Sequence, residues 1–203
     1  MDLFSSEIET SIKNYQLKDA AINYYDSFFS EKEANSFYSH FSNETDWQED
    51  TITVFGKTYK QPRLTALYAL NKKPYSYSGI TMHPKPFTQE LIKIKSKIET
   101  VIDVNFTTVL LNLYRDGNDS NGWHSDDEKE LGKNPIIASV SFGATRQFKL
   151  QHKKDKALKE KIALTHGSLL IMSGTTQHYW KHQIPKTRKV VNPRINLTFR
   201  IIK

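Results

Sequence analysis

A histidine and an aspartate lie two positions apart in "GWHSDDEKEL", residues 122–131. In an extended strand, residues i and i+2 point to the same side, so His124 and Asp126 could bind one metal ion. Two histidines and one carboxylate on one face of an octahedron form a typical non-haem Fe(II) site, with three positions left open. One His-x-Asp pair is weak evidence by itself, and a solvated acidic loop is the alternative interpretation.

A third ligand would have to come from a histidine further along the chain. The candidates are His152, His166, His178 and His182. The spacing alone does not separate His178 from His182.

The C-terminal segment "NPRINLTFRII" alternates strictly between polar and apolar residues, so one face of a strand would carry Arg194, Asn196, Thr198 and Arg200. If this face meets water, the segment is an ordinary amphipathic strand. If it lines a small barrel, two buried guanidinium groups need an anion, and a dicarboxylate would meet both. Asn112 and Tyr114 in "LLNLY" also share one face. They could complete such a pocket or lie on a half-exposed strand.

The first half of the chain contains patterns for both helices and strands. Ser30 followed by Glu33 forms a capping box, which predicts that a helix begins there. Hydrophobic periodicity and turn residues predict four further elements: a helix in 5–16, a strand in 20–29, a hairpin in 51–63 and a helix in 88–102.

From Val109 onward the pattern changes to short β-type runs bounded by Gly, Asn, Pro or charged residues. The runs are 109–117, 136–143, 146–152, 161–174, 177–185 and 194–202. Serial strands of this kind predict a sandwich, barrel or jelly roll, with the helices packed on it, in an α+β fold.

The composition is typical of one compact domain with an N-terminal extension. The chain has 203 residues, 37% of them hydrophobic, and it contains no cysteine. Disulfide scaffolds, Cys-ligated zinc and iron–sulfur clusters are therefore excluded. We expect no signal peptide or membrane span, and an intracellular protein. A net charge of +7 favours a polyanion such as nucleic acid, although ordinary solubility charge explains it equally well.

Three motifs together carry a family resemblance: His124-x-Asp126, His182-x-Ile184-Pro185, and the alternating set from Arg194 to Arg200. They resemble the AlkB family of Fe(II)- and 2-oxoglutarate-dependent dioxygenases, most closely its double-strand-acting DNA-repair demethylases. The similarity begins at about Asp50 and runs to the end of the chain. The resemblance implies a double-stranded β-helix (jelly-roll) core, and it selects His182 as the third metal ligand.

The resemblance also implies a division of the chain and a set of cofactors. Residues 1–50 would be an extension packed on the core, 51–108 a nucleotide-recognition lid with a finger hairpin, and 109–203 the dioxygenase jelly roll. The cofactors would be Fe(II), 2-oxoglutarate and O2. Arg194 resembles the arginine that holds the distal carboxylate of 2-oxoglutarate, and Arg200 the one near the carboxylate beside the keto group. Further cofactor-lining positions would be Asn112, Tyr114, Asn196 and Thr198.

The implied reaction is demethylation of bases such as 1-methyladenine and 3-methylcytosine in DNA, after the base is flipped out of the duplex. In "VFGK", Phe55 matches the wedge of the finger hairpin, followed by Gly56 and Lys57. In the lid segment "YSYSG", Tyr77 would stack the base against His124. The remaining substrate positions by resemblance are Tyr75, Ser76, Asp127, Glu128, Arg188 and Lys189.

We therefore expect alkylated DNA as the partner, with duplex favoured over single strands, and a monomeric enzyme. It would act in the cytoplasm of a bacterium or the nucleus of a eukaryote. The same chemistry on RNA is the alternative; a protein hydroxylase and a nucleic-acid-binding module with an inactive site are less favoured. The lysine-rich segment after Phe148 is shorter than the loop with which the animal enzymes grip the duplex.

Overall fold

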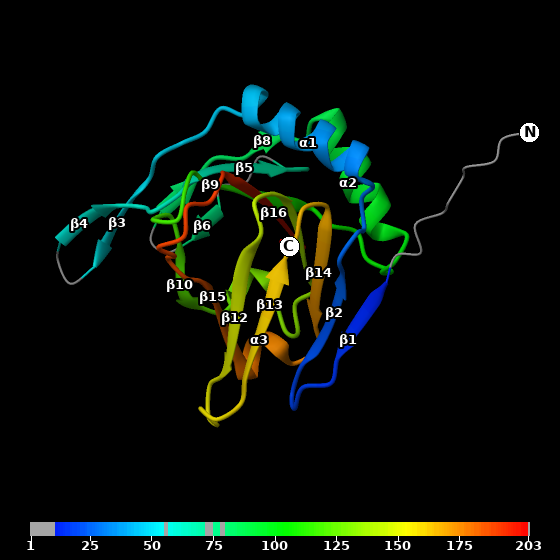
Figure 1. The fold of residues 1–203 in the computed structure, drawn as a ribbon, viewed down its shortest axis with the longest axis vertical. Helices are drawn as coiled ribbons and strands as arrows, with labels where there is room; N and C mark the ends of the chain where they lie inside the picture. Colours follow the sequence, from blue (N-terminus) through cyan, green and yellow to red (C-terminus); the bar gives the residue numbers. More distant parts are fainter. Residues whose placement is uncertain (1–10, 55–56, 72–74, 78–79, 203) are drawn as a thin grey trace, which may run out of the picture.

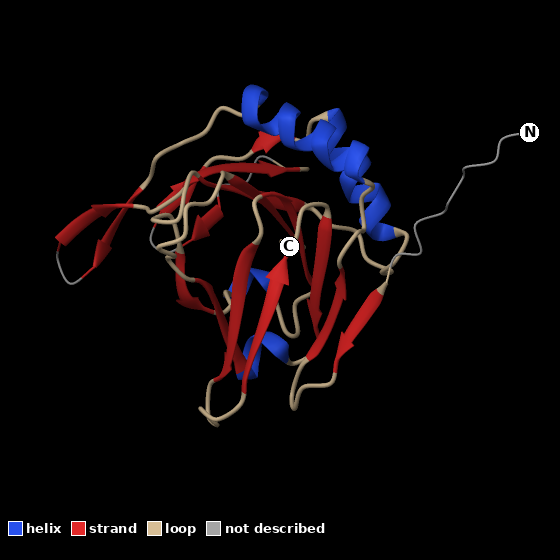
Figure 2. Ribbon diagram, in the orientation of Figure 1, coloured by secondary structure: helices blue, strands red, loops and turns tan. Residues whose placement is uncertain are grey.

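The structure is a computed structural model that describes residues 11–54, 57–71, 75–77 and 80–202. Two β-sheets, one of eight strands and one of four, form the body of the molecule. Two helices, α1 (Glu31–Glu44) and α2 (Gln89–Glu99), lie along one side of the larger sheet, as Figures 1 and 2 show. This arrangement agrees with the expected α+β fold and is consistent with a double-stranded β-helix core.

The larger sheet brings together strands from the whole chain. Its order is β1 (Ile12–Tyr15), β2 (Ala21–Tyr25), β14 (Ser168–Ser173), β11 (Ile137–Gly143), β16 (Arg194–Arg200), β9 (Thr108–Tyr114), β5 (Leu64–Ala69) and β8 (Lys85–Pro86). The pairs are antiparallel except β5 with β8. The three regions 1–50, 51–108 and 109–203 therefore share one sheet, and their boundaries stay a prediction.

The smaller sheet has the order β10 (Asn121–His124), β15 (Trp180–Ile184), β12 (Arg146–His152) and β13 (Lys159–Leu164). Two separate hairpins pair β3 (Thr51–Val54) with β4 (Lys57–Lys60), and β6 (Tyr75–Tyr77) with β7 (Ile80–Met82). The remaining short elements are a helical turn, α3 (Thr176–Tyr179), and a 3-10 turn, η1 (Lys129–Leu131).

The hydrophobic core has two main layers because the larger sheet is buried on both faces. One layer packs α1 and α2 against the sheet and includes Phe41, Ile94, Ile195, Leu197 and Phe199. The other fills the space between the sheets, with residues such as Ile137, Phe148, Leu150, Leu170 and Trp180. Because the apolar face of β16 is covered by the helices, its polar face is directed into the space between the sheets.

The capping box is confirmed at the start of α1. The Ser30 hydroxyl accepts a hydrogen bond from the Glu33 backbone N–H at 3.3 Å, and the Glu33 carboxylate accepts one from the Ser30 N–H at 2.9 Å. The predicted strand in 20–29, hairpin in 51–63 and helix in 88–102 are also present as β2, β3–β4 and α2.

The helix predicted for 5–16 is wrong within the part that the structure describes. Residues Ile12–Tyr15 form the edge strand β1, which pairs with β2. Asp19, with φ of 57°, lies in the turn between the two strands, and its left-handed conformation helps to reverse the chain. Strand pairing with a neighbour in the sheet thus overrides the weak helical periodicity of this segment.

Two of the predicted β-type runs are subdivided in the structure. The run 161–174 forms parts of β13 and β14, separated by a turn that contains Gly167 at φ of 76°. The run 177–185 begins in α3 before it enters β15. The tip residues Phe55 and Gly56 lie outside the described residues, so the roles of the hairpins as finger and lid stay predictions.

Gly143, at the end of β11, should be intolerant of any side chain. Its φ is 87°, and a Cβ there would lie 2.5 Å from the Pro193 carbonyl oxygen and 2.7 Å from Tyr38 Cε2. A left-handed non-glycine residue costs about 1–3 kcal/mol before any clash. We expect Gly143→Ala to lower the melting temperature by about 5 °C or more in thermal unfolding.

Gly122 provides the matched control, because a Cβ at that position would meet nothing within 4 Å. Gly122→Ala should change stability by less than about 0.5 kcal/mol. Equal melting temperatures for the two variants would contradict the assigned backbone geometry at Gly143.

None of the helices in the described ranges is long and apolar enough to cross a membrane.

Candidate active site

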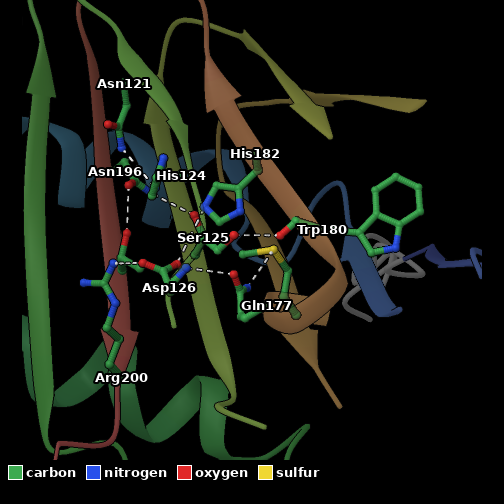
Figure 3. Close-up of polar contacts among 12 residues, drawn as sticks. Asn121, His124, Ser125, Asp126, Gln177, Trp180, His182, Asn196 and Arg200 are labelled. Atoms are coloured by element: carbon green, nitrogen blue, oxygen red, sulfur yellow. Dashed lines mark hydrogen bonds and ion pairs between the residues drawn. The ribbon is translucent and has the colours of Figure 1, made fainter. Parts of the chain in front are cut away.

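Three side chains meet between the two sheets: His124 at the end of β10, Asp126 just beyond it, and His182 on β15. One potential ligand atom from each lies within 4.8 Å of the other two, and Figure 3 shows them turned toward one another. His124 and His182 are direct cross-strand partners, which explains how residues far apart in sequence converge. Within the described part of the chain, this is the one such cluster of metal-ligating side chains.

The hydrogen bonds of His124 leave one ring nitrogen suited to a metal. Its Nδ1 lies 2.7 Å from the Gly122 carbonyl oxygen, which can only accept, so Nδ1 carries the proton. The lone pair is therefore on Nε2, which lies 3.3 Å from the Asn121 amide nitrogen. Burial lowers the pKa of His124, which favours the neutral form that binds metals.

His182 is fixed by packing. Its ring lies against Phe148, with centroids 5.0 Å apart, and meets the His124 ring edge-on at 4.3 Å. Burial and the neighbouring His124 lower the pKa of His182 to about 3, so this histidine is neutral at physiological pH. Both histidines are thus held in the protonation state of metal ligands.

Asp126 is buried, with 2% of its surface exposed, and is held from two sides. Arg200 Nη2 donates to Asp126 Oδ1 at 2.6 Å, while the Asp126 backbone N–H donates to the Gln177 side chain at 2.9 Å (Figure 3). Burial alone would raise the pKa of Asp126, but the charge of Arg200 and the two histidines lower it to about 2. The group is therefore a carboxylate, and its Oδ2 lies on the side of His182, 3.7 Å from Nε2.

The other candidate histidines lie elsewhere. His178 is in α3, with Nε2 2.9 Å from Asn134 Oδ1. His166 accepts a hydrogen bond from the Gly143 N–H, and His152 accepts one from the Asp155 N–H. The structure therefore brings His182 to the cluster and separates His178 from it.

The polar face of β16 lines the same cavity as the three clustered residues. Arg194, Asn196, Thr198 and Arg200 are all buried there, and so are Asn112 and Tyr114 of β9. Of the two interpretations of this alternating strand, the structure has the barrel-lining one, not the water-exposed one. A chain of hydrogen bonds links the amides: Thr198 Oγ1 and Asn112 Nδ2 both donate to Asn196 Oδ1, at 2.9 and 3.4 Å.

Arg194 has the strongest unmet need for a ligand. It is 1% exposed, and its Nη2 donates to Ser141 Oγ at 2.8 Å. Its Nε and Nη1 have no hydrogen-bond partner among the residues that the structure describes. Burial lowers the pKa of Arg194 to about 10, so it is still charged at neutral pH. A buried, charged guanidinium with two unused donors fits a carboxylate, which would accept both hydrogen bonds.

Several cavity residues have no recognisable signal in the sequence. Arg63, at the start of β5, donates from Nε to Asn112 Oδ1 at 2.8 Å and lines the cavity. Ser141 and Gln177 support Arg194 and Asp126 as described above. Arg63 and Gln177 reach their partners only through tertiary contacts, 49 and 51 residues apart in the chain, so local patterns could not identify them. Ser141 could have been noticed only by its alternation within β11.

The residues predicted to contact substrate are more scattered. Lys57 is exposed at the start of β4, and Tyr75, Ser76 and Tyr77 form β6. Asp127 pairs with Lys153 at 2.9 Å. Glu128 has a buried Oε2 with no partner in the described part of the chain, and burial raises its pKa. Arg188 and Lys189 are exposed in the loop before β16.

Comparison with known proteins defines the class first. A family model described as the 2OG-Fe(II) oxygenase superfamily matches residues 9–200, nearly the whole chain. A solved structure of OsALKBH1 has the same fold, with a TM-score of 0.66 at 15% identity over 88% of this chain and 97% of that one. Fe(II) and 2-oxoglutarate are the cofactors of this class, and His124, Asp126 and His182 form the candidate metal site.

Individual relatives place the chain within that class. It is 46% identical to alpha-ketoglutarate-dependent dioxygenase alkB homolog 3 of Bos taurus, over 84% of this chain and 62% of that protein. The corresponding human protein is 44% identical, with 88% and 65% covered. Human DNA oxidative demethylase ALKBH2 is 39% identical, with 88% and 72% covered. The chain belongs to the AlkB family of 2OG-Fe(II) oxygenases, and it spans slightly less than two thirds of the alkB homolog 3 proteins.

Proposed function

We propose that this protein removes methyl groups oxidatively from N-alkylated bases in DNA, using Fe(II), 2-oxoglutarate and O2. The observation that carries the proposal is a buried arginine with two unused donors in the same cavity as a His-Asp-His cluster. That combination suits a site for one iron and one dicarboxylate. The relatives named as a DNA oxidative demethylase supply the substrate class.

The roles follow from the geometry. His124, Asp126 and His182 hold the iron, and Arg200 and Gln177 hold the Asp126 carboxylate in place. Arg194 binds the distal carboxylate of 2-oxoglutarate. The other residues assigned to the cofactor line its cavity: Asn112, Tyr114, Asn196, Thr198 and Arg200.

When bound, the iron and 2-oxoglutarate supply the oxidation of N–CH3 by O2 to N–CH2OH, with conversion of 2-oxoglutarate to succinate and carbon dioxide. The N–CH2OH group then loses formaldehyde and leaves the N–H of the repaired base. The protein contributes orientation and exclusion of water, and the cofactors carry the difficult chemistry.

Charge supports a damaged base as the substrate. A 1-methyladenine or 3-methylcytosine base is positively charged, and a carboxylate near it stabilises it by Coulomb attraction. Asp127 and Glu128 directly follow the metal ligand Asp126 and are proposed for this role. Tyr75, Ser76 and Tyr77 are proposed for the lid, and Arg188 and Lys189 for contacts with the nucleic-acid backbone.

The same chemistry on RNA or other single-stranded nucleic acid is the alternative function. A base wedge favours duplex DNA, because RNA-binding proteins more often take bases that are already unstacked. On either proposal the enzyme acts as a monomer inside the cell, in the cytoplasm of a bacterium or the nucleus of a eukaryote.

A panel of modified oligonucleotides tests the proposal. Single- and double-stranded DNA and RNA carrying 1-methyladenine, 3-methylcytosine or etheno bases would be incubated with Fe(II), 2-oxoglutarate and ascorbate. Mass spectrometry would report loss of the modification. We expect the fastest loss of methyl groups from DNA. Faster loss from RNA would favour the alternative, and no loss from any oligonucleotide would exclude a nucleic-acid demethylase.

Phe55 is predicted to act as the wedge, although it lies outside the described residues. Inserted into a duplex, its ring would fill the gap left by a flipped base and offset part of the unstacking cost of a few kcal/mol. We expect Phe55→Ala to reduce activity on duplex DNA at least about tenfold, with little change on single strands. Matched methylated oligonucleotides would measure this difference.

Thermal unfolding of the same variant supplies the control. Truncating a buried phenylalanine costs about 3–5 kcal/mol, whereas a wedge exposed to solvent should cost almost nothing. Equal losses on the two substrates, or a large drop in melting temperature, would show that Phe55 is a core residue.

A further inference from the structure

The smaller sheet has an outer face that the proposed function does not use. The inward side chains of β12 and β13, such as Phe148, Leu150, Ile162 and Leu164, belong to the core between the sheets. The alternating residues therefore point to solvent. We define the outer lysine face by these outward side chains on β10, β15, β12 and β13: Trp123, Lys149, Lys159, Lys161 and Lys181.

The positions on this face carry charge of one sign only. Between the lysines lie Gln147, Gln151 and Ala163, and the acidic residue of β13, Glu160, alternates to the other side. None of the four lysines pairs with a carboxylate of the described residues within 4 Å. Lysines elsewhere are often paired, such as Lys60 with Glu49 and Lys85 with Asp46, both at 2.6 Å. The outer lysine face is thus a surface of uncompensated positive charge.

The register places two of these lysines in direct opposition. Lys149 on β12 and Lys161 on β13 are cross-strand partners, and Gln151 lies between Lys159 and Lys181 in the next row. Like charges directly opposite one another destabilise a sheet. Lysines on β13, which is an edge strand, can also prevent unwanted strand pairing, but Lys149 and Lys181 lie on inner strands, where that explanation does not apply.

An exposed aromatic ring borders this charge. Trp123 is 41% exposed, and Lys181 Nζ lies 5.1 Å from the centre of its ring. An indole surface in water gains nothing, whereas a nucleic-acid base can stack on it. Rows of lysines beside an aromatic platform are the features by which proteins hold single-stranded nucleic acid without reading its sequence.

We infer that the outer lysine face binds the phosphate backbone of a nucleic-acid strand, with Trp123 stacking on one of its bases. This inference rests on the proposed function, because it extends the contact with the substrate strand beyond the barrel. Trp123 directly precedes the metal ligand His124, so β10 presents the cavity on one side and the outer lysine face on the other. The bound strand is the continuation of the one that delivers the damaged base.

The charge contribution is tested by binding of unmodified oligonucleotides to the full chain. The variant carries Lys149→Gln, Lys159→Gln, Lys161→Gln and Lys181→Gln, and fluorescence anisotropy would follow labelled 20-nucleotide strands of oligo-dT and oligo-U at several salt concentrations. Each lost phosphate contact on a single strand reduces the salt slope by about 0.7. We expect a slope smaller by about 2 and affinity at least about tenfold lower at low salt. Loss on one strand type only would identify DNA or RNA as the occupant.

The stacking contribution is tested separately with Trp123→Ala and Trp123→Phe. The alanine variant should bind roughly tenfold more weakly with an unchanged salt slope, and the phenylalanine variant should retain most of the affinity. Iron content would be measured in both, because Trp123 adjoins His124.

A matched control removes two lysines that lie away from this face, Lys18→Gln and Lys32→Gln, and should leave binding nearly unchanged. If the fourfold variant fails to fold, Lys149→Gln with Lys161→Gln replaces it, since this change relieves a like-charge pair and should not lower the melting temperature. Wild-type affinity and slope in the folded lysine variants would overturn the inference, as would a loss of the same size in the control.

Activity on substrates of two lengths separates this inference from the proposed function. A methylated trinucleotide is too short to reach from the cavity across the sheet, so the lysine variants should demethylate it at the wild-type rate. They should lose activity on a methylated 20-nucleotide strand at low concentration. If the wild-type enzyme demethylates neither substrate, the proposed function fails, and the binding result still decides whether the outer lysine face holds a nucleic acid.

Discussion

Replacing Asp126 with alanine is expected to abolish turnover and to release most of the bound iron. Asp126 is the only anionic member of the candidate metal cluster, and its Oδ2 is on the side of His182. Loss of a ligand that supports several kcal/mol of metal-assisted catalysis corresponds to at least about a thousandfold lower rate. Iron content, measured by a chelator assay, and demethylation of a methylated oligonucleotide would be compared with the wild type.

Two controls make this result specific. Removal of Asp126 also breaks a buried ion pair with Arg200, which by itself can cost about 3–5 kcal/mol of stability, so Asp126→Asn should be tested in parallel. His178→Ala removes a histidine that contacts Asn134 instead of the cluster, and it should keep both iron and activity. Wild-type turnover in a folded Asp126 variant would mean that the metal binds elsewhere.

Replacing Arg194 with lysine is expected to weaken 2-oxoglutarate binding about 10- to 100-fold while iron binding survives. Lysine keeps the positive charge but loses the planar pair of donors, Nε and Nη1, that have no partner in the described part of the chain. Hydrogen bonds to charged groups contribute about 1.5–3 kcal/mol each, which sets the scale of this loss. The dependence of succinate formation on 2-oxoglutarate concentration would measure it.

Arg146 is the matched control, because it is also a buried arginine near Tyr114. Its guanidinium donates to the backbone carbonyls of Asp116, Asp119 and Pro185, so it needs no ligand. Arg146→Lys should lower thermal stability without changing the apparent affinity for 2-oxoglutarate. If Arg194→Lys leaves that affinity unchanged, the distal carboxylate binds to another group.

Some features of this protein follow from short stretches of sequence. The capping box at Ser30 and Glu33 identified the start of α1, because both hydrogen bonds lie within four consecutive residues. Strict alternation placed Arg194, Asn196, Thr198 and Arg200 on one face of a strand, because side chains of any extended chain alternate. The tandem His124-x-Asp126 pair was visible for the same reason. Each of these depends on geometry that extends over only a few residues.

The tertiary structure decided which face is buried and which residues meet. The helices cover the apolar face of β16, so its arginines are directed into the barrel instead of water. The register of β10 with β15 sets His182 opposite His124, while His178 stays in α3. Arg63 reaches Asn112 only because β5 pairs with β9. Pairing between distant strands is selected by the burial of the whole sheet, and so no local pattern in the sequence could specify it.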